Sequence, residues 1–242
     1  MLKEDRLLNE VRHGKFLAMR GAGYIWNWDT PAGKERWSRR IGMLTKHITS
    51  SMHVLEIGCG TGYLTKELAK TRAMVTAIDI SPDLIDIARS AVNEMNVTFK
   101  IENAHSITFP ENTFDTILGS SILHHLDPNE AIRELYRVLK KGGSIFFTEP
   151  NMMNPQVFIQ KNVPLIKKML GDSAHETAFF KWDLRKRLRT AGFTDIIITP
   201  FDFLHPHIPK SLLAFIRPIC NLAEKIPLVS EISGSLYIRA RK

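Results

Sequence analysis

The chain has 242 residues, of which 44% are apolar and 24% charged, and its formal net charge is +8. This composition is typical of a globular protein and excludes a chain that is disordered throughout. The two cysteines, Cys59 and Cys220, form neither a disulfide framework nor a zinc-binding spacing. Residues 1–6 are charged, and no apolar run approaches the ~20 residues of a membrane span, so we expect a cytoplasmic protein.

The positive charge has two interpretations. The excess lysine and arginine can simply cover solvated surfaces. Alternatively, they can attract an anionic partner, such as nucleic acid, a phospholipid surface or a phosphorylated substrate. Charge alone does not choose between these partners.

Short apolar segments alternate with helical patterns from residue 53 onward. The first half predicts strands at 53–57, 74–79, 96–101 and 114–120, with helices at 63–70 and from 82 onward. The second half predicts a helix from 128 onward, strands at 144–148, 194–200 and 235–240, and a helix at 182–191. This alternation indicates an α/β fold, in which helices cover both faces of a parallel sheet.

Two helices have clear start signals. Ser81-Pro82-Asp83 combines an N-cap serine, a proline in the first turn and an acid at the positive end of the helix dipole. Asp127-Pro128 begins another helix, in which Glu130 can complete a capping box. An apolar stripe continues that helix to Leu139, and Gly142 can provide its left-handed end.

A glycine-rich loop directly follows the first predicted strand, at Glu56-Ile57-Gly58-Cys59-Gly60-Thr61-Gly62. Ligands of such sheets bind outside the carboxyl ends of the strands, where glycines let a ligand approach the backbone and the next helix offers free amides. A dinucleotide fingerprint would require glycine at position 63, where the chain has Tyr63. The spacing therefore weakens a nicotinamide-dependent oxidoreductase, and a turn without a ligand is the remaining alternative.

An acid ends the second predicted strand. The carboxylate of Asp79 can accept hydrogen bonds from both hydroxyls of a ribose. It could instead cap the next helix, but Ser81 is better placed to do so. Ile80 can lie flat against an adenine or pack in the core.

Several motifs in chain order resemble those of the class I S-adenosylmethionine-dependent methyltransferases. Val54–Gly62 resembles the family's first motif, and Asp79 matches its ribose-binding acid. Glu102-Asn103-Ala104 falls where the family binds the adenine edge, with asparagine in place of the usual aspartate. Phe114–Ser120 resembles the fourth-strand motif, and Leu139–Gly143 resembles an L-K-P-G-G turn that here has lysine in place of proline.

The resemblance covers about residues 50–150 and has consequences for fold and cofactor. It implies a Rossmann-like sheet of seven strands, mostly parallel with the last strand antiparallel, and helical cap insertions. The implied cofactor is S-adenosylmethionine, and the product is S-adenosylhomocysteine. The residues expected to bind the cofactor lie at the ends of the strands: Glu56, Gly58, Cys59, Gly60, Gly62, Asp79, Ile80, Asn103, Ala104 and Ser120.

Two histidines follow the fourth predicted strand. The methyl group of the cofactor is already activated, so the protein mainly positions the acceptor. His124 and His125 are candidate general bases for a hydroxyl acceptor, with His125 preferred, or else they only wall the pocket. Because neither this pair nor His205-Pro206-His207 has companion acids or cysteines at ligand spacing, we predict no metal.

The single domain, 1–242, divides into an N-terminal lid region at 1–45, a cofactor-binding core at 46–150 and a substrate-side half at 151–242. Aromatic residues in the lid either cover the site or pack in the core. Arg36 could face the cofactor carboxylate or lie in solvent. The candidate acceptor contacts are Tyr24, Trp28, His175 and Glu176.

A helical insertion is expected at about 206–233, where apolar residues recur at helical spacing and Pro218 should bend the helix. We favour a cap over the active site, and the alternative is an amphipathic surface that rests on a membrane.

The predicted reaction is methyl transfer to a small-molecule or lipid-like acceptor, preferably at oxygen. Peripheral membrane contact and the oligomeric state are left open. The chain lacks the Asn/Asp-Pro-Pro-Tyr/Phe and Pro-Cys loops of nucleic-acid methyltransferases, which argues against an RNA or DNA acceptor. A non-enzymatic cofactor-binding or membrane-surface protein is the other alternative, and it would bind the cofactor without turnover.

Overall fold

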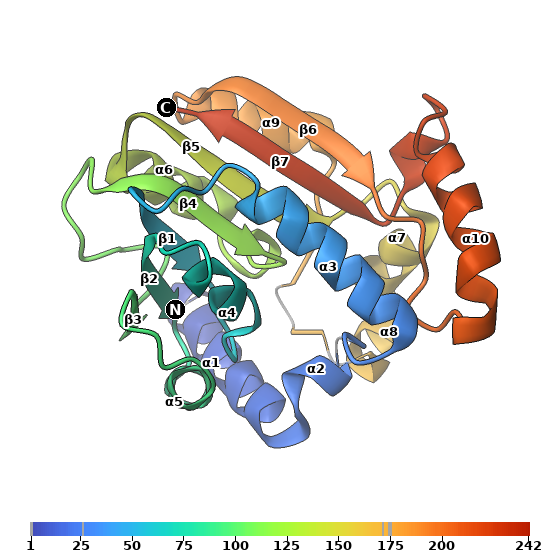
Figure 1. Cartoon of the computed structure of the whole chain (residues 1–242), viewed down its shortest axis with the longest axis horizontal. Helices are drawn as coiled ribbons and strands as arrows, with labels where there is room; N and C mark the ends of the chain where they lie inside the picture. Colours follow the sequence, from blue (N-terminus) through green and yellow to red (C-terminus); the bar gives the residue numbers. More distant parts are fainter. Residues whose placement is uncertain (1, 26, 171, 174–175) are drawn as a thin grey trace.

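The structure is a computed structural model that describes residues 2–25, 27–170, 172–173 and 176–242. Its centre is a seven-stranded sheet with the strand order β3-β2-β1-β4-β5-β7-β6 (Figure 1). The strands are β1 (His53–Ile57), β2 (Met74–Asp79), β3 (Val97–Ile101), β4 (Phe114–Ser120), β5 (Leu139–Pro150), β6 (Thr194–Phe201) and β7 (Ser235–Arg241). The last strand, β7, runs antiparallel to both neighbours, so the predicted fold is confirmed.

The helices lie before the first strand, between successive strands and in two insertions. The N-terminal helices are α1 (Leu2–Arg20), α2 (Ala22–Ile25) and α3 (Pro31–Thr45). The helices that connect strands are α4 (Tyr63–Ala69), α5 (Pro82–Ala91), α6 (Pro128–Val138) and α9 (Lys181–Thr190). The insertions contain α7 (Pro155–Asn162), α8 (Pro164–Met169) and α10 (Lys210–Ala223), and two short 3₁₀ turns are η1 (Leu123–His125) and η2 (Ser230–Ile232).

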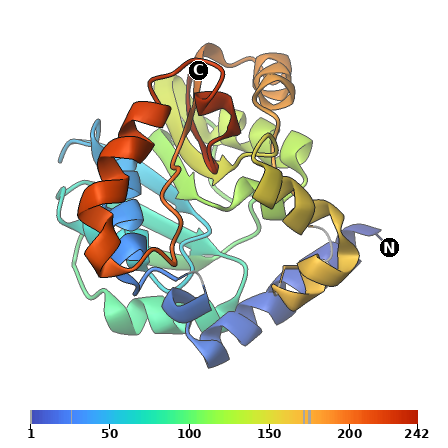
Figure 2. The ribbon, with the colours of Figure 1, turned by 90° about the vertical axis from the view of Figure 1, so that its right-hand side faces the viewer.

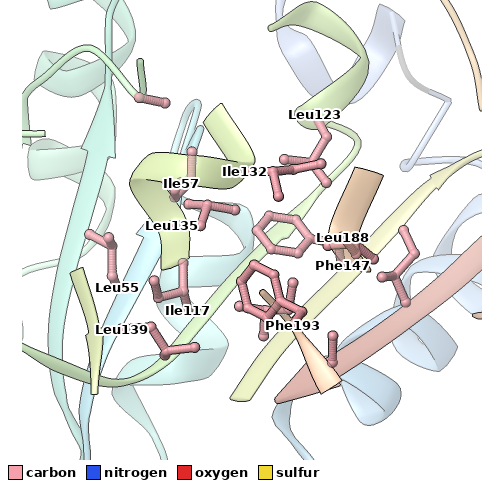
Figure 3. Close-up of a cluster of buried hydrophobic side chains, with 14 of the residues drawn as sticks. Leu55, Ile57, Ile117, Leu123, Ile132, Leu135, Leu139, Phe147, Leu188 and Phe193 are labelled. Carbon is pink, nitrogen blue, oxygen red and sulfur yellow. The ribbon is translucent and has the colours of Figure 1, made fainter. Parts of the chain in front are cut away.

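Apolar stripes of the helices bury both faces of the sheet. On one face, Leu135 of α6 and Leu188 of α9 pack with Phe147 of β5 (Figure 3). On the other face, α3, α4 and α5 contribute Leu44, Leu68 and Ile85 to a second cluster. Burial of these stripes is the main favourable term for the fold and holds the strand ends in fixed positions. None of the helices in the described ranges is both long enough and apolar enough to cross a membrane.

The predicted helix starts have the expected caps. Ser81 Oγ accepts a hydrogen bond from Leu84 N, and Asp127 Oδ1 accepts from Asn129 N and Glu130 N. Each bond satisfies an amide that the helix itself leaves free. These caps fix where α5 and α6 begin and therefore where the loops after β2 and β4 end.

The boundary between α6 and β5 differs from the prediction. The helix ends at Val138, and β5 already begins at Leu139, which pairs with Phe114. Gly142 has a φ of 78°, but its amide donates to Lys242 O at 2.9 Å. It therefore bends the strand instead of ending the helix, because the buried Leu139 gains a place in the sheet.

Candidate active site

The glycine-rich loop makes a tight approach to the loop after β4. Gly58 has a φ of 66°, and a Cβ there would lie 2.4 Å from Ile122 Cγ1. Only glycine tolerates both the conformation and the contact. Gly60 N donates to Asp79 Oδ2 at 2.9 Å, which ties the loop to the end of β2. The close approach of the two loops therefore requires glycine at position 58. The bond from Gly60 fixes the glycine-rich loop to Asp79, the acid expected to bind ribose.

Asp79 retains acceptor capacity after these internal bonds. Its Oδ1 accepts from Ser81 N and its Oδ2 from Gly60 N, both at 2.9 Å. Each carboxylate oxygen has a second lone pair for a hydroxyl donor. Burial raises the pKa of Asp79, and the backbone amides of Ser81 and Gly60 oppose that shift. The chemistry of this carboxylate fits a ribose.

A cavity of about 410 Å³ lies at the carboxyl ends of the strands, within the size range of small-molecule sites. Helices α1, α3 and α7 contribute to its wall, together with the ends of β1, β2, β4 and β5 (Figure 1). A smaller apolar cavity of about 40 Å³ shares part of this wall and is lined by Asp79, Ile80, Asn103 and Ala104. The residues expected to bind the ribose and adenine of the cofactor thus lie in the wall of the smaller space.

Asn103 is already engaged at the smaller cavity. Its Oδ1 accepts from His105 N at 3.0 Å and lies 2.9 Å from His105 Nδ1. The oxygen expected to bind the adenine amino group is therefore turned toward the neighbouring histidine.

Two residues in the wall of the larger cavity, Arg40 and Thr61, have buried polar atoms without a hydrogen-bond partner among the described residues. Arg40 Nη2 donates to Asp202 Oδ2 at 2.8 Å and to Ser235 Oγ at 2.6 Å. Among the described residues, no group hydrogen-bonds Arg40 Nε and Nη1 or Thr61 Oγ1. A buried polar atom without a partner costs free energy, so these atoms fit the charged amino-acid end of the expected cofactor. Arg36 is not simply solvated, because it also lines the cavity and pairs with Asp202.

Glu56 lies in the wall of the same cavity and is almost fully buried. Burial raises the pKa of Glu56 to about 8, against the hydrogen bond that Thr65 Oγ1 donates, and the charge of Asp79 adds to the increase. Glu56 therefore holds a proton at neutral pH. A cationic amino group brought beside it would favour release of that proton.

His124 is the centre of a buried carboxylate network. Its Nδ1 donates to Glu149 Oε2 at 2.7 Å, and its Nε2 lies 3.4 Å from Glu176 Oε1. Burial alone would lower the pKa of His124, but the hydrogen bonds and charges of Glu149 and Glu176 raise it to about 9. Burial would likewise raise the pKa of Glu176, but the hydrogen bond from His124 and the surrounding positive charges lower it. His124 is therefore a cation at neutral pH.

This charge predicts a loss of stability at alkaline pH. The pKa of His124 rises from an unfolded value of 6.5 to about 9 in the folded protein. The resulting stability is fully present below pH 6.5 and is lost as the pH rises through 9. We expect the free energy of unfolding to fall by on the order of 3 kcal/mol across that window.

Urea titrations at pH 6 and pH 9.5 would measure this loss. Glu56 contributes a similar trend, with its loss complete at about pH 8, so the titrations should also use Glu56→Gln, which removes that contribution. Equal unfolding free energies at the two pH values in this variant would contradict a charged His124.

His125 faces the larger cavity from the turn η1 and is oriented by the lid helix. Its Nδ1 donates to Glu10 Oε2 of α1 at 2.9 Å. Because a carboxylate only accepts, this bond requires a proton on Nδ1, and the neutral tautomer that satisfies it carries its lone pair on Nε2. In that tautomer His125 has the form of a general base.

The comparisons with known proteins agree with this geometry. Residues 55–147 match the family model described as a methyltransferase domain. A ubiquinone biosynthesis O-methyltransferase from Coxiella burnetii is 33% identical over 52% of this chain and 57% of its own length. A demethylmenaquinone methyltransferase from Lactiplantibacillus plantarum is 29% identical over 71% of this chain and 82% of its own length.

A solved structure with the same fold covers nearly the whole chain. It is a possible histamine N-methyltransferase from Thermotoga maritima, with a TM-score of 0.66, 18% identity and coverage of 95% of this chain and 97% of its own. The order of motifs, the strand order and the family match agree. Over residues 55–147 this chain matches the methyltransferase-domain family, and its fold is that of the class I S-adenosylmethionine-dependent methyltransferases. Its cofactor is S-adenosylmethionine, as the motifs predicted.

The expected cofactor residues of this methyltransferase surround the two cavities. Glu56, Gly58, Cys59, Gly60, Asp79, Ile80 and Ser120 line the larger cavity, and Asn103 and Ala104 line the smaller one. Gly62 instead begins α4 with a φ of 85°. The assignment of these residues to the cofactor stays a prediction.

Of the four expected acceptor contacts, two line the larger cavity and two lie wholly or partly outside the described residues. Trp28 and Glu176 line the larger cavity, and the Trp28 ring lies 4.9 Å from that of Trp37. The oxygens of Glu176 are engaged by His124, Lys161 and Ser173 N, so this acid belongs to the buried network. The side chain of Tyr24 and the whole of His175 lie outside the described residues.

The insertion at 206–233 does not cap the cavity, so that preference was wrong. No residue of this fully described range lines the larger cavity. Leu213 of α10 packs instead with Ala32 of α3 and with Leu204. The covering elements of the methyltransferase are α1, α3 and the segment that contains α7.

Glu176 adds a third potential metal ligand to the histidine pair. Donor atoms of His124, His125 and Glu176 lie within 4.8 Å of one another. The sequence offered no acid at ligand spacing beside the histidines. The ammonium of Lys161 bonds Glu176 and also lies 2.9 Å from Asp172, which opposes a second cation there. The expectation of a metal-independent enzyme stays a prediction.

The sequence analysis missed three candidate site residues, Glu10, Arg40 and Glu149. Glu149 had a usable signal, since it is an acid that directly follows the strand predicted at 144–148. Glu10 lies in a charged helix, and Arg40 lies among other basic residues. Neither carried a local signal, because their roles depend on partners more than 100 residues away.

Proposed function

We propose that this methyltransferase moves a methyl group from S-adenosylmethionine to a hydroxyl oxygen of a small, quinol-like or lipid-like acceptor. The observation that carries the proposal is the Glu10–His125 pair at the wall of the cavity. Such a pair suits proton removal from a hydroxyl, which makes the oxygen a stronger nucleophile.

The cofactor supplies a methyl group on a cationic sulfur, and the chain supplies position and proton transfer. Glu10 holds the Nδ1–H of His125, so Nε2 can accept the hydroxyl proton as the oxygen attacks. The resulting imidazolium is stabilised by the same carboxylate. His124 cannot take this role, since its pKa of about 9 keeps it protonated.

The names of the relatives support the acceptor class. One relative is named for O-methylation in ubiquinone biosynthesis and the other for demethylmenaquinone. Both names refer to quinones, and the first specifies oxygen. Because the first relative matches over only 57% of its length, the acceptor is our proposal for this chain.

The direct test is a labelled-methyl assay with a panel of catechols, hydroquinones and amines, with products identified by mass spectrometry and NMR. The proposal expects an O-methyl product from a dihydroxy ring. Transfer only to a ring carbon or to an amine would contradict it.

Cofactor binding should depend on the Asp79 carboxylate. We expect Asp79→Asn to weaken binding of S-adenosylhomocysteine by about 1–3 kcal/mol, because an amide replaces an ionised acceptor of the ribose hydroxyls. Calorimetric titration would measure this, with Asp83→Asn as a control because Asp83 is exposed on α5. Equal affinities for wild type and Asp79→Asn would remove Asp79 from the cofactor site.

A further inference from the structure

Helix α10 has two apolar faces, and only one of them is covered. Leu213 is buried against α3, with Ile216 and Cys220 packed beside it. The outer face exposes large apolar side chains at helical spacing and continues past the end of the helix. Its members, which we call the outer face of α10, are Leu212, Phe215, Ile219, Leu222, Ile226 and Leu228.

The outer face of α10 is bordered by positive charge. Lys210 and Lys225 are exposed near its two ends, and residues 203–223 include no acid. The next acid, Glu224, is turned inward, where it bonds Arg39 and accepts from Asp202 N at 2.8 Å. This arrangement is complementary to an anionic surface and unsuited to pairing with a second copy, whose lysines would repel.

A second exposed apolar segment lies on the same side of the molecule. Figure 2 shows α10 and the α7–α8 segment on the face toward the viewer. Phe158, Val163, Leu165 and Met169 are exposed there, and residues 151–171 include no acid. The same segment lines the cavity through Val157 and Gln160. This side of the molecule therefore adjoins the reaction chamber.

We propose that the outer face of α10, assisted by α7–α8, docks the enzyme on a bilayer that contains anionic phospholipid. The helix lies flat, its apolar side chains enter the headgroup boundary, and the lysines at its ends contact phosphates. Docking goes beyond methyl transfer and does not depend on the identity of the acceptor. It would let an amphiphilic acceptor reach the cavity without crossing water.

Co-sedimentation with vesicles tests the docking. We expect the wild-type protein to sediment with phosphatidylcholine vesicles that contain phosphatidylglycerol, and raised salt to release it. Phe215→Asp should weaken this partitioning about tenfold or more, because it places a charge on the outer face of α10, which enters the headgroup boundary. Met95→Asp makes the same change at a fully exposed methionine beside the β3 edge and should bind like wild type.

Three results would overturn the proposal. They are a wild-type protein that stays in the supernatant, Phe215→Asp that sediments like Met95→Asp, and a dimer in ultracentrifugation that Phe215→Asp dissociates without any vesicle binding. Titration of S-adenosylhomocysteine into Phe215→Asp, which should match wild type, verifies that the variant folds. It also separates a failure of docking from a failure of methyl transfer.

Discussion

Replacement of His125 by asparagine is expected to lower kcat by about 10²–10⁴-fold, the usual contribution of a positioned general base. Asparagine can still donate to Glu10 and so keep α1 in place, but it has no basic nitrogen to accept the hydroxyl proton. Binding of S-adenosylhomocysteine should stay close to the wild-type value. Steady-state turnover with the best acceptor and calorimetry on the same preparation would separate the two effects.

His13→Asn is the matched control for this experiment. His13 lines the same cavity, and its ring lies 5.9 Å from that of His125. It should keep kcat within a few-fold of wild type, because no step is assigned to it. If His125→Asn turned over as fast as His13→Asn, His125 would only wall the pocket and the oxygen acceptor would lose its main support.

The second large effect is expected for Glu149, which is fully buried at the end of β5. Its Oε1 accepts from Ile122 N at 3.0 Å and Leu123 N at 2.8 Å, while Oε2 holds His124. Glu149→Leu would leave the buried Nδ1–H of His124 and the backbone amides of Ile122 and Leu123 without their acceptor. We expect a loss of about 3–5 kcal/mol in the free energy of unfolding at pH 7.

Urea unfolding of Glu149→Leu would measure this loss in the free energy of unfolding. Glu134→Leu is the control, because Glu134 is a partly exposed acid. Glu134 also accepts from a backbone amide, Ile107 N, and pairs with Arg137, but solvent reaches it. Its loss should be about 1 kcal/mol. A loss for Glu149→Leu as small as that for Glu134→Leu would mean that the network around His124 contributes little to stability.

Glu149 and Glu10 both position residues of the same turn, η1. Glu149 fixes the turn η1 from the carboxyl end of β5, and Glu10 orients His125 on that turn from the lid. Ser173 Oγ also donates to Glu10 at 2.7 Å, which joins the lid to the segment after α8. The base therefore depends on three parts of the chain that are distant in sequence.

Much of the core could be predicted from the sequence because its signals are local. The bounds of β1, β2 and β4 agree with the prediction, since each is a short apolar run that ends at a glycine loop, an acid or a polar turn. Ser81 and Asp127 cap their helices through amides only two or three residues away. The positive φ of Gly58, 66°, likewise agrees with a glycine loop directly after a buried strand.

Only the tertiary structure decided the polar partners and the place of the insertion. Glu10 and Arg40 meet His125 and Asp202 across more than 100 residues of chain, and no local pattern records such a pairing. Helical spacing showed that 210–223 has apolar faces, but not that α3 covers one of them and leaves the other exposed. A local sequence pattern specifies which side chains avoid water, whereas the packing of the whole chain decides what covers them.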